Sequence, residues 1–348
     1  MSIDLLTNFF PPEEQHGIAR YVEDLAVGLA ERHHEVVVIA LSPNLRATEK
    51  RKNFTIYWVP KFKRWWTDFL PSLALLINSI KIRKVLYKIN LEKPFDVVEY
   101  PNDGCSAFAV LIKGISFPSP KFVNRLSSPR KVFNKQSKLP RLTETLEALQ
   151  ARFSDAIIGN TYANLRLCEK IYGIKQHIPR TVILHGLPCK AYSVNKLPSS
   201  HGEKLNILFL GRMEARKGFD LLAKAWPKIL ASIPSATLVV AGEDTVFNKN
   251  YSYFKWALKD IPSNARNSLK YLGTVSSEVK ELLYEQCDLC VMPSRYESFG
   301  LVLLEAMRYA KPVVSCQVGG IPEVVTHGKT GWLVSPDNVD ALAEAIIQ

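Results

Sequence analysis

Two carboxylates stand eight residues apart in the stretch 295–307, on either side of a glycine-containing turn that opens an apolar run. If that run is a helix, the turn presents backbone N–H groups and the positive end of a helix dipole, which suit a diphosphate. Ser298 is a suitable N-cap for such a helix. Glu297 outside the helix and Glu305 inside it would accept hydrogen bonds from a hexose and a ribose. The spacing indicates a nucleotide-linked sugar as ligand, and the alternative is an amphipathic helix with two surface glutamates.

Glycine- and proline-containing motifs lie on both sides of this stretch. After it come Lys-Pro-Val-Val-Ser at 311–315, Val-Gly-Gly-Ile-Pro-Glu-Val-Val at 318–325 and His-Gly-Lys-Thr-Gly-Trp-Leu-Val at 327–334. Before it stand Leu-Phe-Leu-Gly-Arg-Met-Glu-Ala-Arg-Lys-Gly at 208–218 and Gly-Ile-Ala-Arg at 17–20. Together these motifs resemble those of the retaining glycosyltransferases of family 4. The resemblance is specific in the second half of the chain and looser in the first.

The resemblance implies a GT-B architecture, in which two doubly wound, Rossmann-like α/β domains face each other across a cleft. It also implies transfer of a hexosyl unit from a nucleoside diphosphate sugar to a hydroxyl of a glycan or lipid-linked acceptor, with retention at the anomeric carbon. In the family pattern Glu297 binds sugar hydroxyls, Glu305 binds the ribose, and Gly17 approaches the phosphates from the first domain. The amides expected to bind the diphosphate belong to Phe299, Gly300, Leu301 and Val302.

Arg212 and Lys217 stand five residues apart in a segment expected between a strand and a helix, where both could reach a leaving diphosphate. A pair of surface cations on a turn is the alternative, but cations at these positions are typical of the family 4 donor site. The sequence contains no Asp-x-Asp motif that would bring a divalent metal to the diphosphate. We therefore expect metal-independent chemistry without a cofactor. Arg212, Lys217 and Glu297 are the expected catalytic residues, and the two cations would stabilise the departing charge.

The first half departs from the family pattern at two positions. His16 and Gly17 stand where many members have two glycines. Either His16 partly obstructs the closest backbone approach to the phosphates or it makes a contact itself, and Gly17 is the expected phosphate contact. Ser127 occupies a place where the family often has a histidine, and a hydroxyl can donate or accept a hydrogen bond but cannot act as an imidazole base. Asp103 would orient the acceptor hydroxyl, or else close an Asx turn with its neighbours.

The length of 348 residues and the 47% hydrophobic content suit two packed domains. Short runs of Val, Ile and Leu alternate with longer helical patterns, which predicts parallel sheets covered by helices. We expect an N-terminal acceptor-side domain at 1–186, a linker without periodicity at 187–203 and a C-terminal donor domain at 204–348. Strands are expected at 3–7, 35–40, 55–59, 96–99, 121–125, 156–158, 182–184, 206–210, 237–241, 289–292, 312–315 and 332–334, and helices at 17–32 and 143–152.

The formal net charge of +12 raises the question of which anion the protein meets. Between residues 50 and 93 basic residues alternate with aromatic and aliphatic ones, a pattern that suits a segment lying on anionic lipid. A core helix with solvated lysines on its outer face is the alternative. Its longest apolar run, 69–80, is too short to span a bilayer. No nucleic-acid-binding module is recognisable, so nucleic acid is not an expected partner.

Six cysteines are scattered through apolar segments, and the chain does not open on a basic segment followed by an apolar run and a cleavage site. These features predict a cytoplasmic protein, with peripheral attachment to the inner face of the membrane if lipid is bound. Cys287 and Cys290 have the spacing of a zinc or redox pair, but no second pair completes a tetrahedral site, so core packing is expected.

Family members usually continue beyond the helix expected at 340–347 with a segment that crosses back onto the first domain. The sequence ends at residue 348, so we expect that crossing helix to be missing and the domains to be more loosely coupled. Two alternatives to a transferase stay open, and the missing histidine and the short C-terminus favour the first of them. One is a degenerate protein that binds the sugar nucleotide without turnover, and the other is a nucleotide-sugar epimerase on the same fold.

Overall fold

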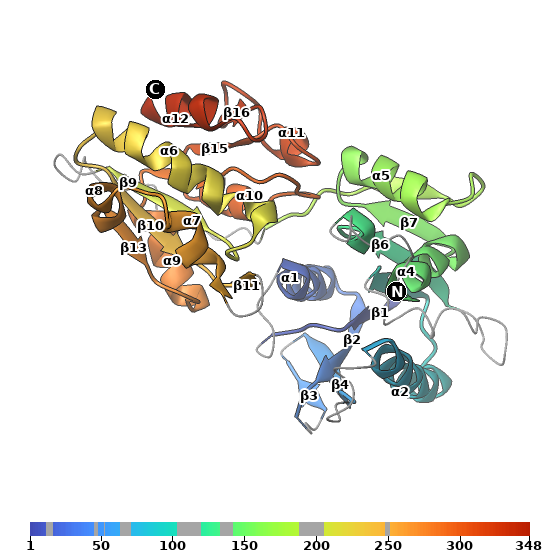
Figure 1. Cartoon of the computed structure of the whole chain (residues 1–348). Helices are drawn as coiled ribbons and strands as arrows, with labels where there is room; N and C mark the ends of the chain where they lie inside the picture. Colours follow the sequence, from blue (N-terminus) through green and yellow to red (C-terminus); the bar gives the residue numbers. More distant parts are fainter. Residues whose placement is uncertain are drawn as a thin grey trace. The chain divides into compact units, whose positions relative to one another are not determined.

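The computed structural model describes residues 1–11, 17–44, 48–51, 53–62, 71–102, 120–132, 142–187, 205–247 and 251–348. The chain divides into two compact units, Met1–Pro188 and Cys189–Gln348. Each unit is an α/β structure on its own largely parallel sheet, so the predicted fold class is confirmed (Figure 1). Apart from its first residue, the linker expected at 187–203 lies outside the described residues, and its bounds remain a prediction.

The sheet of the first unit has the strand order β3-β4-β2-β1-β5-β6-β7-β8. Neighbouring strands run parallel except the short β3, which is antiparallel to β4. The strands are β1 Ser2–Thr7, β2 Glu35–Ser42, β3 Glu49–Lys50, β4 Phe54–Pro60, β5 Val97–Pro101, β6 Lys121–Leu126, β7 Ala156–Gly159 and β8 Arg180–Val182. The helices are α1 Gly17–Glu31, α2 Pro71–Glu92, α4 Leu142–Phe153 and α5 Tyr162–Tyr172, with a 3-10 turn η1 at Arg130–Val132.

Two helices cover opposite faces of this sheet because successive residues of a strand point to opposite sides. Leu5 of β1 packs with Val22 and Ala26 of α1. Its neighbour Leu6 packs with Leu86 of α2 in a separate cluster. Both faces of β1 are therefore buried, each in a different hydrophobic cluster. For this reason apolar residues such as Leu5 and Leu6 follow one another along β1 and do not strictly alternate with polar ones.

The second sheet has the strand order β13-β10-β9-β14-β15-β16, and its paired strands are parallel. This is the 3-2-1-4-5-6 order of the dinucleotide-binding fold. Its strands are β9 Asn206–Leu210, β10 Thr237–Ala241, β13 Leu269–Tyr271, β14 Leu289–Met292, β15 Val313–Cys316 and β16 Trp332–Val334, and β11 Val246–Phe247 pairs separately with β12 Tyr251–Ser252. The helices are α6 Phe219–Ser232, α7 Tyr253–Leu258, α8 Ser263–Asn267, α9 Ser277–Gln286, α10 Leu301–Arg308, α11 Ile321–Val324 and α12 Val339–Ile347, with a 3-10 turn η3 at Ala215–Lys217.

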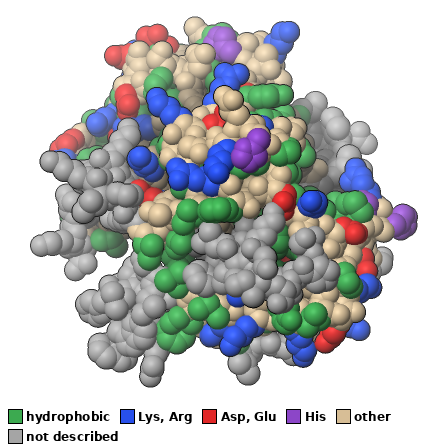
Figure 2. All heavy atoms as spheres, turned by 90° about the vertical axis from the view of Figure 1, so that its right-hand side faces the viewer, with side chains coloured by type: hydrophobic (Ala, Val, Ile, Leu, Met, Phe, Trp, Pro, Cys, Tyr) green, Lys and Arg blue, Asp and Glu red, His purple; other side chains and the backbone are tan. Residues whose placement is uncertain are grey.

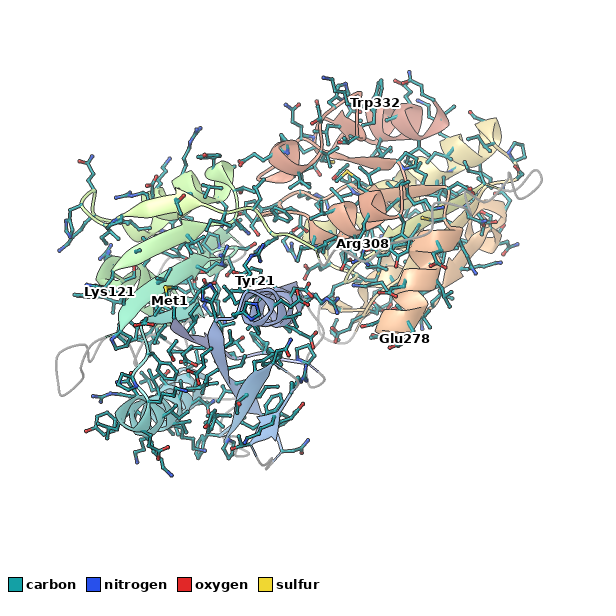
Figure 3. All side chains as sticks on the ribbon, turned by 180° about the vertical axis from the view of Figure 1, so that it is seen from behind. Met1, Tyr21, Lys121, Glu278, Arg308 and Trp332 are labelled. Atoms are coloured by element: carbon teal, nitrogen blue, oxygen red, sulfur yellow. The ribbon has the colours of Figure 1, made fainter. Side chains whose placement is uncertain are left out.

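The strand order reverses between β9 and β14 in the second sheet and between β1 and β5 in the first. In open α/β sheets, ligands bind beyond the carboxyl ends of the strands at such a reversal. Met1 and Lys121, labelled in Figure 3, mark the amino-terminal ends of β1 and β6 in the first sheet. The site is expected at the other ends of these strands. In the second unit the loops that follow β9 and β14 are therefore the expected place for a site.

Several elements differ from the sequence-based expectation. β8 begins two residues before the strand expected at 182–184. The structure also contains β13, where the sequence predicted no strand. The prediction of Ser298 as a helix N-cap is wrong, because α10 begins at Leu301 with Gly300 as its N-cap. Gly300 has φ 97° and ψ 48°, a left-handed conformation that glycine adopts readily. The chain therefore turns at Gly300, after the position that the sequence suggested.

Asp4 is a buried carboxyl group in the otherwise apolar strand β1. Its side chain is fully buried, and in the described part of the chain neither carboxyl oxygen has a hydrogen-bond partner. Burial raises the pKa of Asp4 well above its ordinary value, and the nearby Leu5 amide offsets only part of this effect. Asp4 is therefore protonated in the folded protein at pH values at which it ionises in the unfolded chain.

Asp4→Val should stabilise the first unit at neutral pH by about 1–3 kcal/mol, the cost of burying a polar group without a partner. Because the folded pKa is raised, the wild-type protein loses stability as pH rises from the unfolded pKa of about 3.9 towards the folded pKa. The gain in Tm of the variant over the wild type should thus increase as pH rises from the unfolded pKa of about 3.9 towards the raised folded pKa. Thermal unfolding at several pH values measures it, and a gain independent of pH would contradict a protonated Asp4.

Candidate active site

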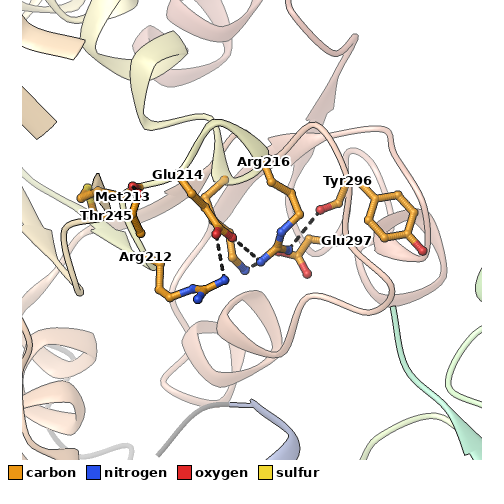
Figure 4. A network of polar contacts seen from close by, with 8 residues as sticks. Arg212, Met213, Glu214, Arg216, Thr245, Tyr296 and Glu297 are labelled. Atoms are coloured by element: carbon orange, nitrogen blue, oxygen red, sulfur yellow. Dashed lines mark hydrogen bonds and ion pairs between the residues drawn. The ribbon is translucent and has the colours of Figure 1, made fainter. Parts of the chain in front are cut away.

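The loop after β9 carries cations toward the loop after β14. It reaches α6 through the short turn η3, which has Arg216 and Lys217 at its end. Both side chains donate hydrogen bonds to Glu297, which follows β14 (Figure 4). Lys217 and Glu297 were identified separately in the sequence, and the structure brings them together where the strand order of the second sheet reverses.

Glu297 is a buried carboxylate held by two cations. Its Oε1 accepts from Lys217 Nζ and from Arg216 Nη1, the latter at 3.1 Å, and the residue is only 7% exposed. Burial by itself would raise the pKa of Glu297, but the two positive charges and their hydrogen bonds outweigh it and hold the pKa below its ordinary value. Glu297 is therefore ionised at neutral pH. Its Oε2 has no partner among the described residues and can accept a hydrogen bond from a ligand hydroxyl.

Arg212 lies at the more exposed end of the same network. Its side chain is 55% exposed, and its Nη2 is 2.8 Å from Oε2 of Glu214. The other oxygen of Glu214 is 2.5 Å from Nη2 of Arg216, so one carboxylate joins both arginines. The contacts therefore run from Arg212 through Glu214 and Arg216 to Glu297 and Lys217, and they link three positive groups with two negative ones (Figure 4).

Arg295 fixes the loops after β9 and β14 against each other. Its backbone N–H donates to the carbonyl of Arg216 at 2.8 Å, and its guanidinium makes two 2.8 Å contacts with Asp220 in the first turn of α6. Its Nε donates to Asp337 at 2.6 Å. Although burial favours a higher pKa for Asp220, hydrogen bonds from Arg295 and Tyr253 hold the pKa below its ordinary value. This charged brace holds η3 beside the loop after β14.

Glu305 lies inside α10 and is 9% exposed. It faces α9 rather than solvent, because Lys280 Nζ donates to its Oε1 at 2.8 Å and the Tyr284 hydroxyl donates to its Oε2 at 2.7 Å. The two partners are four residues apart on α9, so they project from one face of that helix. Both carboxylate oxygens are therefore engaged within the protein, and a ligand hydroxyl would have to use the remaining lone pairs.

The amides expected to bind the diphosphate lie where the chain enters α10. The first N–H groups of a helix have no acceptor within it and carry the positive end of its dipole. Gly300 caps α10 without a side-chain hydrogen bond. Phe299 is buried, whereas Leu301 and Val302 are half-buried. The structure therefore places helix N–H groups within a few residues of Glu297, at the carboxyl end of β14.

Of the residues expected in the first unit, the structure describes Gly17 and Ser127. Gly17 is exposed and begins α1, the helix that follows β1. Ser127 follows β6, and its N–H and hydroxyl both donate to Oδ1 of Asn102, at 2.5 and 2.8 Å. Ser127 therefore holds the ends of two neighbouring strands together. His16 and Asp103 lie outside the described residues.

Sequence reasoning missed four groups that contact the predicted residues: Glu214, Arg216, Lys280 and Tyr284. Arg216 could have been predicted from the sequence, because it precedes Lys217 in the 208–218 motif that was expected to bind the diphosphate. Cys287 and Cys290 are buried free thiols in the core of the second unit, as expected. Within the described residues no three His, Cys, Asp or Glu side chains are placed to hold a metal ion.

A doubly wound sheet with cations, a buried glutamate and a helix N-terminus at its strand-order reversal suits an anionic ligand such as a phosphate. Comparison with protein families identifies the class of protein. Residues 204–348 match the family model described as glycosyl transferases group 1, and residues 16–189 match that of glycosyltransferase family 4. The chain belongs to glycosyltransferase family 4.

Known proteins resemble the chain over nearly its whole length. It is 28% identical to an uncharacterised glycosyltransferase of Methanocaldococcus jannaschii, over 99% of this chain and 87% of the relative. Sucrose-phosphate synthase from Thermosynechococcus elongatus superposes with a TM-score of 0.74 at 20% identity, covering 99% of this chain and 88% of that one. HepE of Anabaena, in complex with UDP and glucose, gives a TM-score of 0.71 at 20% identity, covering 100% and 89%. At these identities the solved structures support the fold.

Gly319 lies where the loop after β15 meets the backbone of Glu297. Its φ is +52°, and a Cβ built on it would lie 1.9 Å from the carbonyl oxygen of Glu297. That oxygen accepts the N–H of Gly320 at 2.9 Å, so the two loops are hydrogen-bonded at the point of closest approach. A side chain at Gly319 would force apart the backbone that places the Glu297 carboxylate.

Gly319→Ala should lower the free energy of unfolding of the second unit by about 3 kcal/mol or more, since it adds a backbone clash to the left-handed strain. Gly328→Ala is the matched control, because Gly328 has φ +73° but nothing within 4 Å of its Cβ position. The control should cost about 1–2 kcal/mol, the strain alone. Urea unfolding measures both, and equal losses would mean that the Glu297 loop can move aside.

Proposed function

We propose that this protein transfers a hexosyl unit from a nucleoside diphosphate sugar to a hydroxyl of a glycan or lipid-linked acceptor, with retention at the anomeric carbon and without a metal ion. The strongest support is the placement of Lys217 and Arg216 against Glu297, close to the N-terminus of α10. The UDP and glucose in the HepE structure support a nucleotide donor. The M. jannaschii glycosyltransferase supports the transfer reaction but not a particular acceptor.

The predicted catalytic and donor-binding residues each have a role in this proposal. Glu297, ionised and with Oε2 unengaged, accepts hydrogen bonds from hydroxyls of the donor sugar. Glu305 accepts from the ribose. The amides at the start of α10 and the cations Arg212 and Lys217 bind the diphosphate, and Gly17 is a further proposed contact of the phosphates. Arg216, which contacts Glu297 as Lys217 does, belongs to the same group of cations.

The reaction we propose proceeds on one face of the sugar. The bond from the anomeric carbon to the donor phosphate oxygen breaks with its electron pair on the phosphate, and the acceptor oxygen forms its bond from the same side. The departing phosphate oxygen takes the acceptor proton, so no imidazole base is required at Ser127. Negative charge grows on the phosphate as the bond breaks, and fixed cations and amides stabilise it most at that stage.

Lys217→Ala should lower turnover by about 100-fold or more, the scale of removing one transition-state donor. Lys217→Arg keeps the charge and should retain much of the activity. Lys270→Ala, at an exposed lysine of β13, is the control for loss of a positive charge from the same unit. Transfer is followed with radiolabelled nucleotide sugars and membrane extract, and undiminished turnover of Lys217→Ala would refute the assignment.

The same assay separates the transferase from its alternatives. Label that moves to lipid or polymer supports the proposed transfer, including a place in polysaccharide biosynthesis. Release of free sugar or nucleotide without an acceptor supports an epimerase. Donor binding without any product supports a degenerate sugar-nucleotide-binding protein.

We also propose peripheral association with an anionic membrane surface through α2. Ile80, Tyr87 and Leu91 are 41%, 38% and 58% exposed, and their spacing puts them on one stripe along the helix. Lys84 lies within this stripe and Lys88 beside it, both exposed. On the lower part of the face shown in Figure 2, basic and hydrophobic side chains lie next to each other. In the described part of the chain, no helix has the length and apolar character that crossing a bilayer requires.

Lys84→Gln/Lys88→Gln should weaken binding to phosphatidylglycerol vesicles by about 25-fold, roughly fivefold for each lysine removed from the surface. Arg166→Gln/Lys170→Gln is the control, because these exposed residues of α5 have the same spacing and the substitutions remove the same charge from the same unit. Vesicle cosedimentation measures both. Equal effects would indicate general charge attraction, and absence of wild-type binding would remove the membrane from the proposal.

A further inference from the structure

Glu214 has no role in the proposed transfer, yet it joins the cations of the site. It is the N-cap residue of η3, with extended backbone at φ −143° and ψ 153°, and its side chain makes no capping hydrogen bond. An N-cap side chain ordinarily accepts from an amide of the first turn. Here its two oxygens contact Nη2 of Arg212 at 2.8 Å and Nη2 of Arg216 at 2.5 Å instead.

The two arginines are held to different degrees. Arg216 is 21% exposed and has further contacts, since its Nη1 lies 3.1 Å from Glu297 Oε1 and 3.4 Å from the carbonyl of Tyr296. Arg212 is 55% exposed, and within the described residues Glu214 is its single ion-pair partner. An anion entering the site could therefore take Arg212 from Glu214 without disturbing Arg216.

The charge of the network limits its attraction for a diphosphate. Arg212, Arg216 and Lys217 supply three positive charges, and Glu214 and Glu297 supply two negative ones, so the net charge is +1. Glu297 is buried between its two cations. The half-exposed pair of Glu214 with Arg212 is the part of the network that can exchange, because an exposed ion pair has little net stability.

From this geometry we propose that Glu214 is an exchangeable counter-ion for Arg212. It holds the guanidinium while the site is empty, releases it to the donor diphosphate, and takes it back as the nucleoside diphosphate leaves. This inference rests on the proposed function, because it assigns a regulatory partner to the same diphosphate site. Glu214 then weakens nucleotide binding and speeds product release, so its removal should have the opposite effect from removal of a phosphate-binding residue.

Glu214→Gln keeps the shape of the side chain and removes its charge. In calorimetric titrations with UDP, GDP and ADP, it should bind whichever nucleotide the wild type binds about fivefold more tightly, because the diphosphate no longer competes with a carboxylate for Arg212, and an exposed ion pair contributes about that factor. Stopped-flow dissociation of that nucleotide should slow by a similar factor. In an Arg212→Met background, Glu214→Gln should change the affinity by less than about twofold, because the exchange requires Arg212.

Glu285→Gln, at an exposed glutamate of α9, is the control for loss of one negative charge from the same unit, and it should leave the affinity unchanged. Unchanged or weaker nucleotide binding by Glu214→Gln would overturn the inference while leaving the proposed function in place. So would an undiminished effect in the Arg212→Met background, which would indicate direct repulsion of the nucleotide. If the wild type and all variants bind none of the three nucleotides, the proposed function falls and the inference with it.

Discussion

A carboxylate that is withdrawn from water must have its charge compensated within the protein, and the candidate site depends on that condition at Glu297. An isolated buried charge costs far more than a folded domain can spare. Lys217 and Arg216 supply the compensation, and their loop must therefore lie against the loop that carries Glu297. A buried ion pair is often no more stable than an apolar replacement of the same volume. Fold stability alone therefore does not explain the pairing of Glu297 with Lys217 and Arg216, whereas the proposed donor would give these charges a role.

The fold brings these loops together through strand order. β9 and β14 are adjacent in the second sheet although 78 residues separate the end of one from the start of the other. The helices that follow them lead away from the sheet, so their first residues are left at the carboxyl edge, where amides and side chains can meet a ligand. Arg295 then fixes the two loops with backbone and side-chain contacts to Arg216 and Asp220. The position of Lys217 is thus determined mostly by groups other than its own partner.

Sequence reasoning succeeded where a pattern is local and failed where packing decides. The central strands β9, β10 and β14 have the expected bounds, because each is an apolar run buried on both faces. The edge strands β8 and β13 were misplaced or missed, since a strand at the edge of a sheet is half exposed and needs no such run. Glu297 and Lys217 could be found from motifs. Lys280 and Tyr284 could not, because their contact with Glu305 depends on how α9 packs beside α10.

Glu297 and Glu305, the two carboxylates of the stretch 295–307, differ in their hydrogen-bond partners although they are residues of one type. Glu297 is ion-paired through one oxygen and retains the other for a ligand, so it can accept a hydroxyl without breaking any contact of its own. Glu305 is hydrogen-bonded through both oxygens to α9. A ribose hydroxyl bound as proposed would therefore either share an oxygen with Lys280 or Tyr284 or displace one of them. In the proposed complex, Glu297 would bind its ligand through an oxygen that is already available, whereas ligand binding by Glu305 would depend on the position of α9. Sequence spacing treats them as equivalent, and their surroundings make Glu297 the stronger candidate for contact with the reacting sugar.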